Sequence, residues 1–334
     1  MRTLVILLSL LFVAGAFAQK GWYPHEGGVL KYRVNIRFGQ EPDTMPKGWY
    51  FGRVSAVATD SHGDVYVFHR GTAADPVVVL DHEGKYLRSW GKGEFGNAHG
   101  IEVDAEDNVW TVDNGHHTVQ KWTREGKLLL TLGTKGKSGE TENTFYRPTD
   151  VAFAKDGSLY VSDGYGNSRV VKFSKEGKYL LAWGKKGRAP GEFVLPHNVA
   201  LDSKGNVYVS DRENNRIQIF DPNGKFLKMW THLGATQGIW ITPEDEVWVI
   251  THRNNIQNIT YDTLAGLIMK IDLATGEILG SMPSPGHWLT VANNGDIFIG
   301  SLTGNVFRWY EGWLDRGLFG RDLVDEGQTP PTRH

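Results

Sequence analysis

One short pattern recurs six times along the chain and constrains its fold more than any other feature. Each copy opens with a polar residue and continues as a strand-like stretch that alternates apolar and aromatic side chains. The copies are residues 64–68, 108–112, 158–162, 206–210, 246–250 and 296–300. Their spacing of 40 to 50 residues leaves room for four short strands per repeat. Six such repeats predict an all-β, six-bladed β-propeller.

Residues 196–220 illustrate how one repeat is built. Two alternating stretches flank a tight turn at residues 203–205, and a third stretch follows. A turn at residues 221–224 then leads into a fourth strand. The sixth repeat ends after its third strand, residues 305–310. We therefore expect the early segment 29–38 to supply the missing outer strand and close the ring.

The first residues have the composition of a secretory signal peptide. Arg2 precedes an apolar run, residues 4–13, which is shorter than a membrane span and is followed by small residues. We expect a signal peptide at residues 1–18, the propeller at 19–313 and a polar tail at 314–334. The mature protein should be secreted or periplasmic.

Charge and cysteine content exclude several classes of partner and site. The net charge is −2 with no basic excess, so no nucleic-acid partner is expected. The chain has no cysteine, which excludes disulfides and Cys-ligated metal sites. We expect a monomer that acts on a small molecule or peptide and has no membrane partner.

Histidine occupies alternate positions of the predicted channel wall. Counting back ten residues from the second residue of each repeated stretch reaches the start of a first strand. These positions are Ser55, His99, Thr149, His197, Gln237 and His287. Because first strands line the central channel, the three histidines should face one axis from directions roughly 120° apart. Three imidazoles with room for an exchangeable ligand are typical of catalytic zinc. The alternative is that polar side chains merely fill the channel.

Loops on the same face of the propeller carry two cations and a phenol. Arg70 and Arg212 follow the second strands of the first and fourth repeats, and Tyr165 lies one residue past the matching place in the third. Two guanidiniums and a phenol above a metal can hold an anionic substrate and move a proton. The alternative is that these side chains solvate the rim, with Arg212 paired to Glu213 or Asp211.

The repeats resemble NHL repeats, and several loops resemble one enzyme family. The most specific stretches are DGYGNSR, residues 163–169, and DRENNRIQ, residues 211–218. The others are FHRG at 68–71, AHGIEVD at 98–104, RPTDVAF at 147–153, LPHNVAL at 195–201 and GHWLTV at 286–291. Together they resemble peptidyl-α-hydroxyglycine α-amidating lyase, the lyase half of peptidylglycine α-amidating monooxygenase.

The resemblance implies a role for each candidate residue. The zinc ligands would be His99, His197 and His287, the catalytic base Tyr165, and the substrate-holding cations Arg70 and Arg212. One departure concerns calcium. Residues 285–288 read Pro-Gly-His-Trp where the family has Met-Pro-His-Asp, so Trp288 replaces an acidic ligand of a structural Ca²⁺.

Two main functional hypotheses follow from these features. The first is an exported, zinc-dependent lyase that breaks the C–N bond of an N-acyl- or peptidyl-α-hydroxyglycine, giving an amide and glyoxylate. The alternative is a non-catalytic propeller that binds a protein or peptide, which exposed Trp240 and Trp288 side chains would favour. A sugar-lactone hydrolase is less favoured, because sites of that type resemble carboxylate and amide cages for Ca²⁺, whereas the channel positions here are His, Thr, Gln and Ser.

Overall fold

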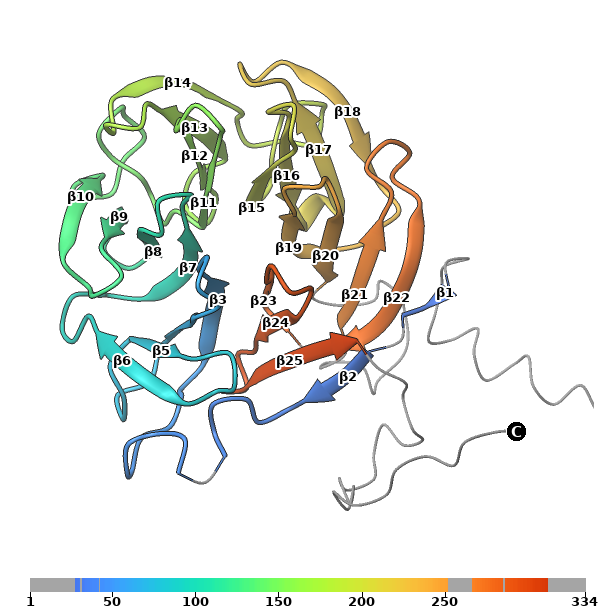
Figure 1. Cartoon of the computed structure of the whole chain (residues 1–334). Coiled ribbons are helices and arrows are strands. Elements are labelled where there is room, and N and C mark those ends of the chain that lie inside the picture. The colour runs from blue at the N-terminus through green and yellow to red at the C-terminus, as the bar shows by residue number, and fades with distance from the viewer. Residues whose placement is uncertain (1–27, 31, 42, 252–265, 285, 312–334) are drawn as a thin grey trace, which may run out of the picture.

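The computed structural model describes residues 28–30, 32–41, 43–251, 266–284 and 286–311. They form six sheets arranged as blades around a central axis, as Figure 1 shows. The six-bladed propeller predicted from the repeats is therefore confirmed. Among these residues no helix is long and apolar enough to cross a membrane. The predicted signal peptide and polar tail lie outside the described residues.

The first three blades are four-stranded antiparallel meanders, with the first strand nearest the axis. Blade one contains β3 (Val54–Thr59), β4 (Val65–His69), β5 (Val77–Leu80) and β6 (Tyr86–Trp90). Blade two contains β7 (Ala98–Val103), β8 (Val109–Asp113), β9 (Thr118–Trp122) and β10 (Leu128–Leu132). Blade three contains β11 (Asp150–Phe153), β12 (Leu159–Asp163), β13 (Arg169–Phe173) and β14 (Tyr179–Trp183).

Blades four and five repeat this arrangement, whereas blade six contributes three consecutive strands. Blade four contains β15 (Pro196–Leu201), β16 (Val207–Asp211), β17 (Arg216–Phe220) and β18 (Phe226–Trp230), with a short 3₁₀ turn, η1 (Arg212–Asn214), after β16. Blade five contains β19 (Thr236–Ile241), β20 (Val247–Thr251), β21 (Gly266–Ile271) and β22 (Ile278–Ser284). Blade six contains β23 (Trp288–Val291), β24 (Ile297–Gly300) and β25 (Val306–Glu311).

The N-terminal segment closes the ring between blades five and six. β2 (Tyr32–Asn35) pairs antiparallel with β25 as the outer strand of blade six, with Val34 opposite Trp309. This confirms the closing strand predicted at residues 29–38. The structure adds a contact that the repeats did not predict, because β1 (Gly28–Val29) pairs in parallel with β22 of blade five.

The core lies between neighbouring blades, which explains the apolar second strands. All five residues of β8, and all five of β16, are buried because each blade is covered on both faces. Tryptophans at the ends of fourth strands pack against the hairpin turn of the next blade. A Cβ on Gly126 would lie 2.4 Å from Cγ of Trp90, so only glycine leaves room for that ring. The repeated turn glycine thus permits close packing of the blades as well as the turn.

Candidate metal centre

Three histidines meet at the axis of the propeller. His99 and His197 are the second residues of β7 and β15, and His287 comes directly before β23. Their side chains are buried, with exposures of 0%, 0% and 3%. The ring centroids are 5.0, 5.3 and 5.2 Å apart, which makes a nearly equilateral triangle. One nitrogen of each ring lies within 4.8 Å of the other two. The structure therefore brings together the three residues that the repeat spacing selected.

Backbone carbonyls of the intervening blades orient the three rings. Nδ1 of His99 lies 2.7 Å from the Thr149 oxygen, and Nδ1 of His197 lies 2.7 Å from the Gln237 oxygen. Nδ1 of His287 lies 2.6 Å from the oxygen of Ser55. A carbonyl oxygen can only accept, so each Nδ1 carries the proton and donates it. In a neutral ring this leaves the Nε2 lone pair for a ligand, which is the usual arrangement of metal-binding histidine.

The electrostatic surroundings of His99 and His197 disfavour the protonated form of each ring. Burial holds the pKa of His99 well below its usual value, and the charges of His287 and Arg70 lower it further. Burial likewise depresses the pKa of His197, with Arg212 the next cause. Neutral imidazole is the form that binds a metal ion. Because of the same shifts, a metal ion that binds these imidazoles at neutral pH has little competition from protons.

The donor set fits a divalent cation. The Tyr165 hydroxyl oxygen lies 3.2 Å from Nε2 of His99 and 3.2 Å from Nε2 of His197. A phenol has one proton, so it cannot donate to both lone pairs. A buried pocket with more acceptors than donors is unfavourable unless a cation joins it. The buried histidine cluster can therefore hold a metal ion.

Two glycines position Tyr165 in the loop between β12 and β13. A Cβ on Gly164 would lie 2.0 Å from the carbonyl oxygen of Pro196, the residue before His197. A Cβ on Gly166 would lie 2.2 Å from Cγ of Tyr146. Both flanking residues must therefore be glycine for the loop to pack this closely. The DGYG stretch is explained by these two contacts.

Arg70 is fixed beside the histidines by its Nε. This atom donates to the Ser55 hydroxyl at 2.9 Å and to the Ala98 carbonyl at 2.8 Å. The guanidinium is half-buried, and this burial lowers the pKa of Arg70. Its terminal amino groups have no hydrogen-bond partner among the described residues, so they are available to an anion.

Two further guanidiniums lie over the Tyr165 ring. Arg212 is 5.8 Å from the ring centroid and forms an ion pair with Glu213, from both Nε and Nη2 at 3.0 Å. The sequence left Glu213 and Asp211 as alternative partners, and the structure selects Glu213. Arg147 is 5.4 Å from the same centroid. Sequence reasoning missed Arg147, although it opens the RPTDVAF stretch that carries the family resemblance. His252, which follows β20 as Arg212 follows β16, lies outside the described residues.

Trp288 fills the space beside the triad instead of facing solvent. It is 1% exposed, and its ring stacks on His287 with centroids 6.1 Å apart. Its Nε1 donates to Oε1 of Glu102 at 3.2 Å. An indole N–H can only donate, so this residue cannot replace the acidic calcium ligand that the resemblance implies. Calcium does not fit at this position.

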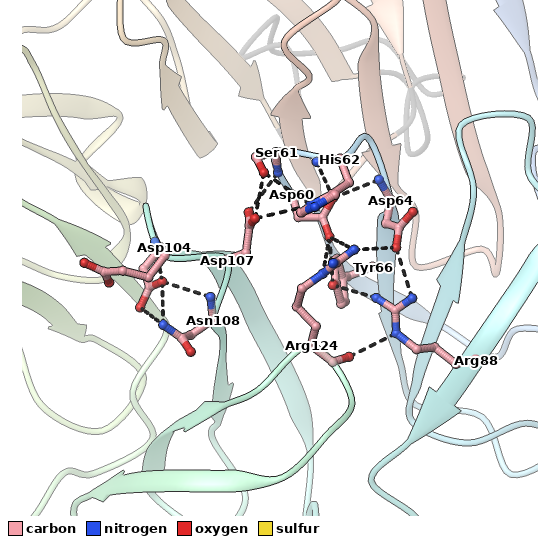
Figure 2. Close-up of polar contacts among 11 residues, drawn as sticks. Asp60, Ser61, His62, Asp64, Tyr66, Arg88, Asp104, Asp107, Asn108 and Arg124 are labelled. Carbon is pink, nitrogen blue, oxygen red and sulfur yellow. Dashed lines mark hydrogen bonds and ion pairs between the residues drawn. The ribbon is translucent and has the colours of Figure 1, made fainter.

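A second group of ligand-type side chains lies at the other end of the first strands. Figure 2 shows Asp60, His62 and Asp107, whose ligand atoms lie within 4.8 Å of one another. Asp60 accepts from Nε of Arg124 at 3.0 Å, and Asp107 accepts from the backbone N–H and hydroxyl of Ser61 at 2.9 and 2.6 Å. These bonds join blade one to blade two. We interpret the group as a structural link between blades.

Comparison with known proteins agrees with the repeats seen in the sequence. The NHL repeat profile matches residues 145–173 and 193–220. Mouse peptidyl-glycine α-amidating monooxygenase is 30% identical over 297 residues, covering 76% of this chain and 30% of that protein. This chain thus spans under a third of the length of that relative. A probable peptidyl-α-hydroxyglycine α-amidating lyase of Caenorhabditis elegans is 29% identical, with 75% of this chain and 80% of the relative covered.

A solved structure supports the fold, and a further relative supports the family. A streptogramin B lyase structure superposes with a TM-score of 0.57 at 14% identity, covering 84% of this chain and 98% of that one, which supports the fold alone. Human NHL repeat-containing protein 3 is 33% identical over 241 residues, covering 67% of this chain and 68% of the relative. The chain therefore belongs to the NHL repeat family, and its homologues include proteins named as α-amidating monooxygenases and α-amidating lyases.

Proposed function

We propose that the chain is a zinc-dependent carbon–nitrogen lyase. Its substrate would be an N-acyl- or peptidyl-α-hydroxyglycine, and its products an amide and glyoxylate. The observation that supports this best is the Tyr165 hydroxyl, 3.2 Å from Nε2 of both His99 and His197. A proton acceptor beside a set of metal ligands suits removal of the proton from a substrate hydroxyl. The relatives named as α-amidating lyases support the same substrate class.

The reaction balances without a second substrate. The hydroxyl on the α-carbon loses its proton, and its C–O bond becomes the C=O bond of glyoxylate. The C–N bond breaks with its electron pair on nitrogen, and the nitrogen takes up a proton to become the amide. A zinc ion bound at the triad would supply Lewis acidity toward a substrate oxygen. Nothing is oxidised or reduced.

The protein side chains have separate roles in this proposal. Tyr165, as the phenolate, would accept the proton of the substrate hydroxyl and return it to the leaving nitrogen. Arg70, anchored through Nε by Ser55 and Ala98, pairs its terminal amino groups with the substrate carboxylate. Arg212 adds positive charge beside Tyr165, where negative charge develops during the reaction.

We also propose that the protein is exported. The basis is the composition of residues 1–18, with a basic start and a short apolar run. Expression of the full chain in a secreting host, followed by mass measurement of the exported product, tests this. The expected product begins at Gln19, and an uncleaved intracellular chain would contradict the proposal.

The alternative, a non-catalytic binding propeller, receives less support from the site. Trp288 is buried, so it offers no docking surface at the axis. Trp240 is partly buried and lines a cavity of about 140 Å³ with Glu102 near the other end of the channel. The name of NHL repeat-containing protein 3 states no activity, so the family alone does not decide between enzyme and binding module.

Two measurements on the purified full chain test the proposed function. Elemental analysis should find one zinc ion per chain, and incubation with N-benzoyl-α-hydroxyglycine should release glyoxylate and benzamide in equal amounts. Removal of the metal should abolish release, and added zinc should restore it. Protein without stoichiometric metal, or release that continues after the metal is removed, would overturn the proposal.

A further inference from the structure

The mouth of the channel carries more positive charge than one substrate carboxylate can neutralise. Arg53 and Arg147 both lie close enough to Arg70 for their charges to act on it. Arg147 and Arg212 both lie over Tyr165. Within the part of the chain that the structure describes, only Arg212 of these four forms an ion pair. The other three guanidiniums create an anion-attracting surface above the triad.

Arg147 is held in place by its backbone, although its side chain is exposed. Its φ is 62°, in the left-handed region that a non-glycine residue adopts at a cost of about 1–3 kcal/mol. Its N–H donates to Nδ1 of His117 at 3.2 Å, and its carbonyl accepts the N–H of Tyr165 at 3.2 Å. The Gly166 N–H also donates to the Tyr146 carbonyl at 2.9 Å. The strained segment is thus tied directly to the loop that carries Tyr165.

Arg70, Arg212 and Arg147 differ in what they can still bind. Arg70 is half-buried and anchored through Nε, so it suits the carboxylate next to the reacting carbon. Arg212 is already paired with Glu213. Arg147 has an exposed guanidinium with no ion pair among the described residues, and it lies 5.4 Å from the ring of Tyr165.

We propose that Arg147 binds a second anionic group of the substrate, carried by its acyl or peptide portion. The preferred substrate would then be an N-acyl- or peptidyl-α-hydroxyglycine with an acidic group close to the scissile bond. The reaction step in this proposal rests on the proposed function, whereas the binding step can be measured without turnover. Arg147 is in this view a specificity-determining residue.

A matched pair of substrates tests the preference. N-succinyl- and N-butyryl-α-hydroxyglycine have acyl chains of equal length, and only the first carries a second carboxylate. Wild-type kcat/KM should be higher for the succinyl compound by about fivefold, the effect of one exposed ion pair. Arg147→Gln should bring the ratio of the two kcat/KM values close to one, whatever change it makes to the rate that both compounds share. Arg37→Ala, which removes an exposed arginine on the outer side of blade six, should keep the wild-type ratio.

Uncleavable analogues separate this proposal from the proposed function. N-succinylglycine and N-butyrylglycine lack the reacting hydroxyl, so calorimetry can measure their binding without turnover. Wild type should bind the succinyl compound about fivefold more tightly, and Arg147→Gln should bind the two compounds equally. Absence of glyoxylate release with both hydroxyglycines overturns the proposed function, while the binding ratio still decides the role of Arg147. If Arg147→Gln unfolds at the same temperature as wild type and still has the wild-type ratio of binding constants, the proposed role of Arg147 is wrong.

Discussion

Trp288 donates its indole N–H to the carboxyl of Glu102, with Nε1 3.2 Å from Oε1, beside the histidine triad. Both side chains are buried, at 1% and 8% exposure. Burial raises the pKa of Glu102 well above its usual value, and the charge of Asp150 raises it further. The direction of this shift favours the neutral form of the carboxyl, which accepts the indole N–H and does not need a cation beside it.

This pair predicts that the protein does not depend on calcium. Titration of Ca²⁺ into the zinc-loaded protein, followed by calorimetry, should show no binding heat and no increase in Tm. Trp288→Phe keeps most of the ring packing and removes the N–H, so it should lower stability by about 1–3 kcal/mol, the cost of a buried polar group left unpaired. Tight calcium binding by the wild type would contradict this interpretation.

Tyr165→Phe separates catalysis from metal binding. The change removes only the hydroxyl, which lies 3.2 Å from the two histidine nitrogens. Loss of a general base lowers kcat by about 10²- to 10⁴-fold. Zinc content should remain that of the wild type, because the three imidazoles are unchanged. Elemental analysis and glyoxylate release on the same sample provide both readouts, and near-normal turnover would rule out Tyr165 as the base.

His197→Ala should remove the metal ion. His197 supplies one of the three clustered nitrogens, and two imidazoles alone make a weak site. The variant also loses the Nδ1–H bond to the Gln237 carbonyl, so some loss of stability is expected. Circular dichroism should still report a folded β-protein, since the blade cores do not include this residue. Retention of stoichiometric zinc would show that the triad is not the metal site.

Gly164→Ala should damage catalysis from outside the triad. The added Cβ would lie 2.0 Å from the Pro196 carbonyl oxygen, so the Tyr165 loop must move away from His197. Overpacking of this kind costs about 1–3 kcal/mol. As a control, Gly136→Ala adds a Cβ with nothing within 4 Å, at a φ of 75°, and should lower stability without lowering kcat. Equal kcat in both variants would show that the Gly164 contact does not position Tyr165.

The repeat period was sufficient to predict the parts of the site that lie on strands. His99, His197 and His287 occupy equivalent positions at the starts of first strands, so counting along the sequence located them. The period also exposed the missing strand of blade six, because only three strands followed the last repeat. These features depend on regular geometry, which a periodic sequence encodes directly.

Features that depend on loop conformation could not be predicted in this way. Arg147 reaches Tyr165 because it adopts a left-handed φ, which no sequence rule assigns to arginine. The binding-module hypothesis expected an exposed Trp288 side chain, whereas its N–H donates to the buried carboxyl of Glu102. The two-residue strand β1 is too short to have any periodicity. In each case a tertiary contact, not a local pattern, decides the outcome.

His69 should make stability depend on pH in a defined window. Its Nδ1 accepts the N–H of Gly71 at 2.9 Å and of Gly52 at 3.2 Å, and burial lowers its pKa to about 4. Because the unfolded pKa is about 6.5, the unfolded chain takes up a proton between these values while the folded chain does not. The free energy of unfolding therefore falls as pH falls from about 6.5 to about 4, by up to about 3 kcal/mol from this residue.

Comparison of wild type with His69→Gln isolates this effect. Glutamine does not titrate, and its carbonyl oxygen can still accept the two backbone N–H groups. Other groups, such as Asp150 with its raised pKa, contribute in the opposite direction but equally in both proteins. Urea unfolding at a series of pH values gives the free energy of unfolding at each pH. Below about pH 6.5 this free energy should fall less steeply with falling pH in the variant than in wild type. If the free energy of unfolding changes with pH in the same way in both proteins, His69 is protonated as easily in the folded state as in the unfolded one. The two backbone N–H groups that donate to its Nδ1 argue against that outcome.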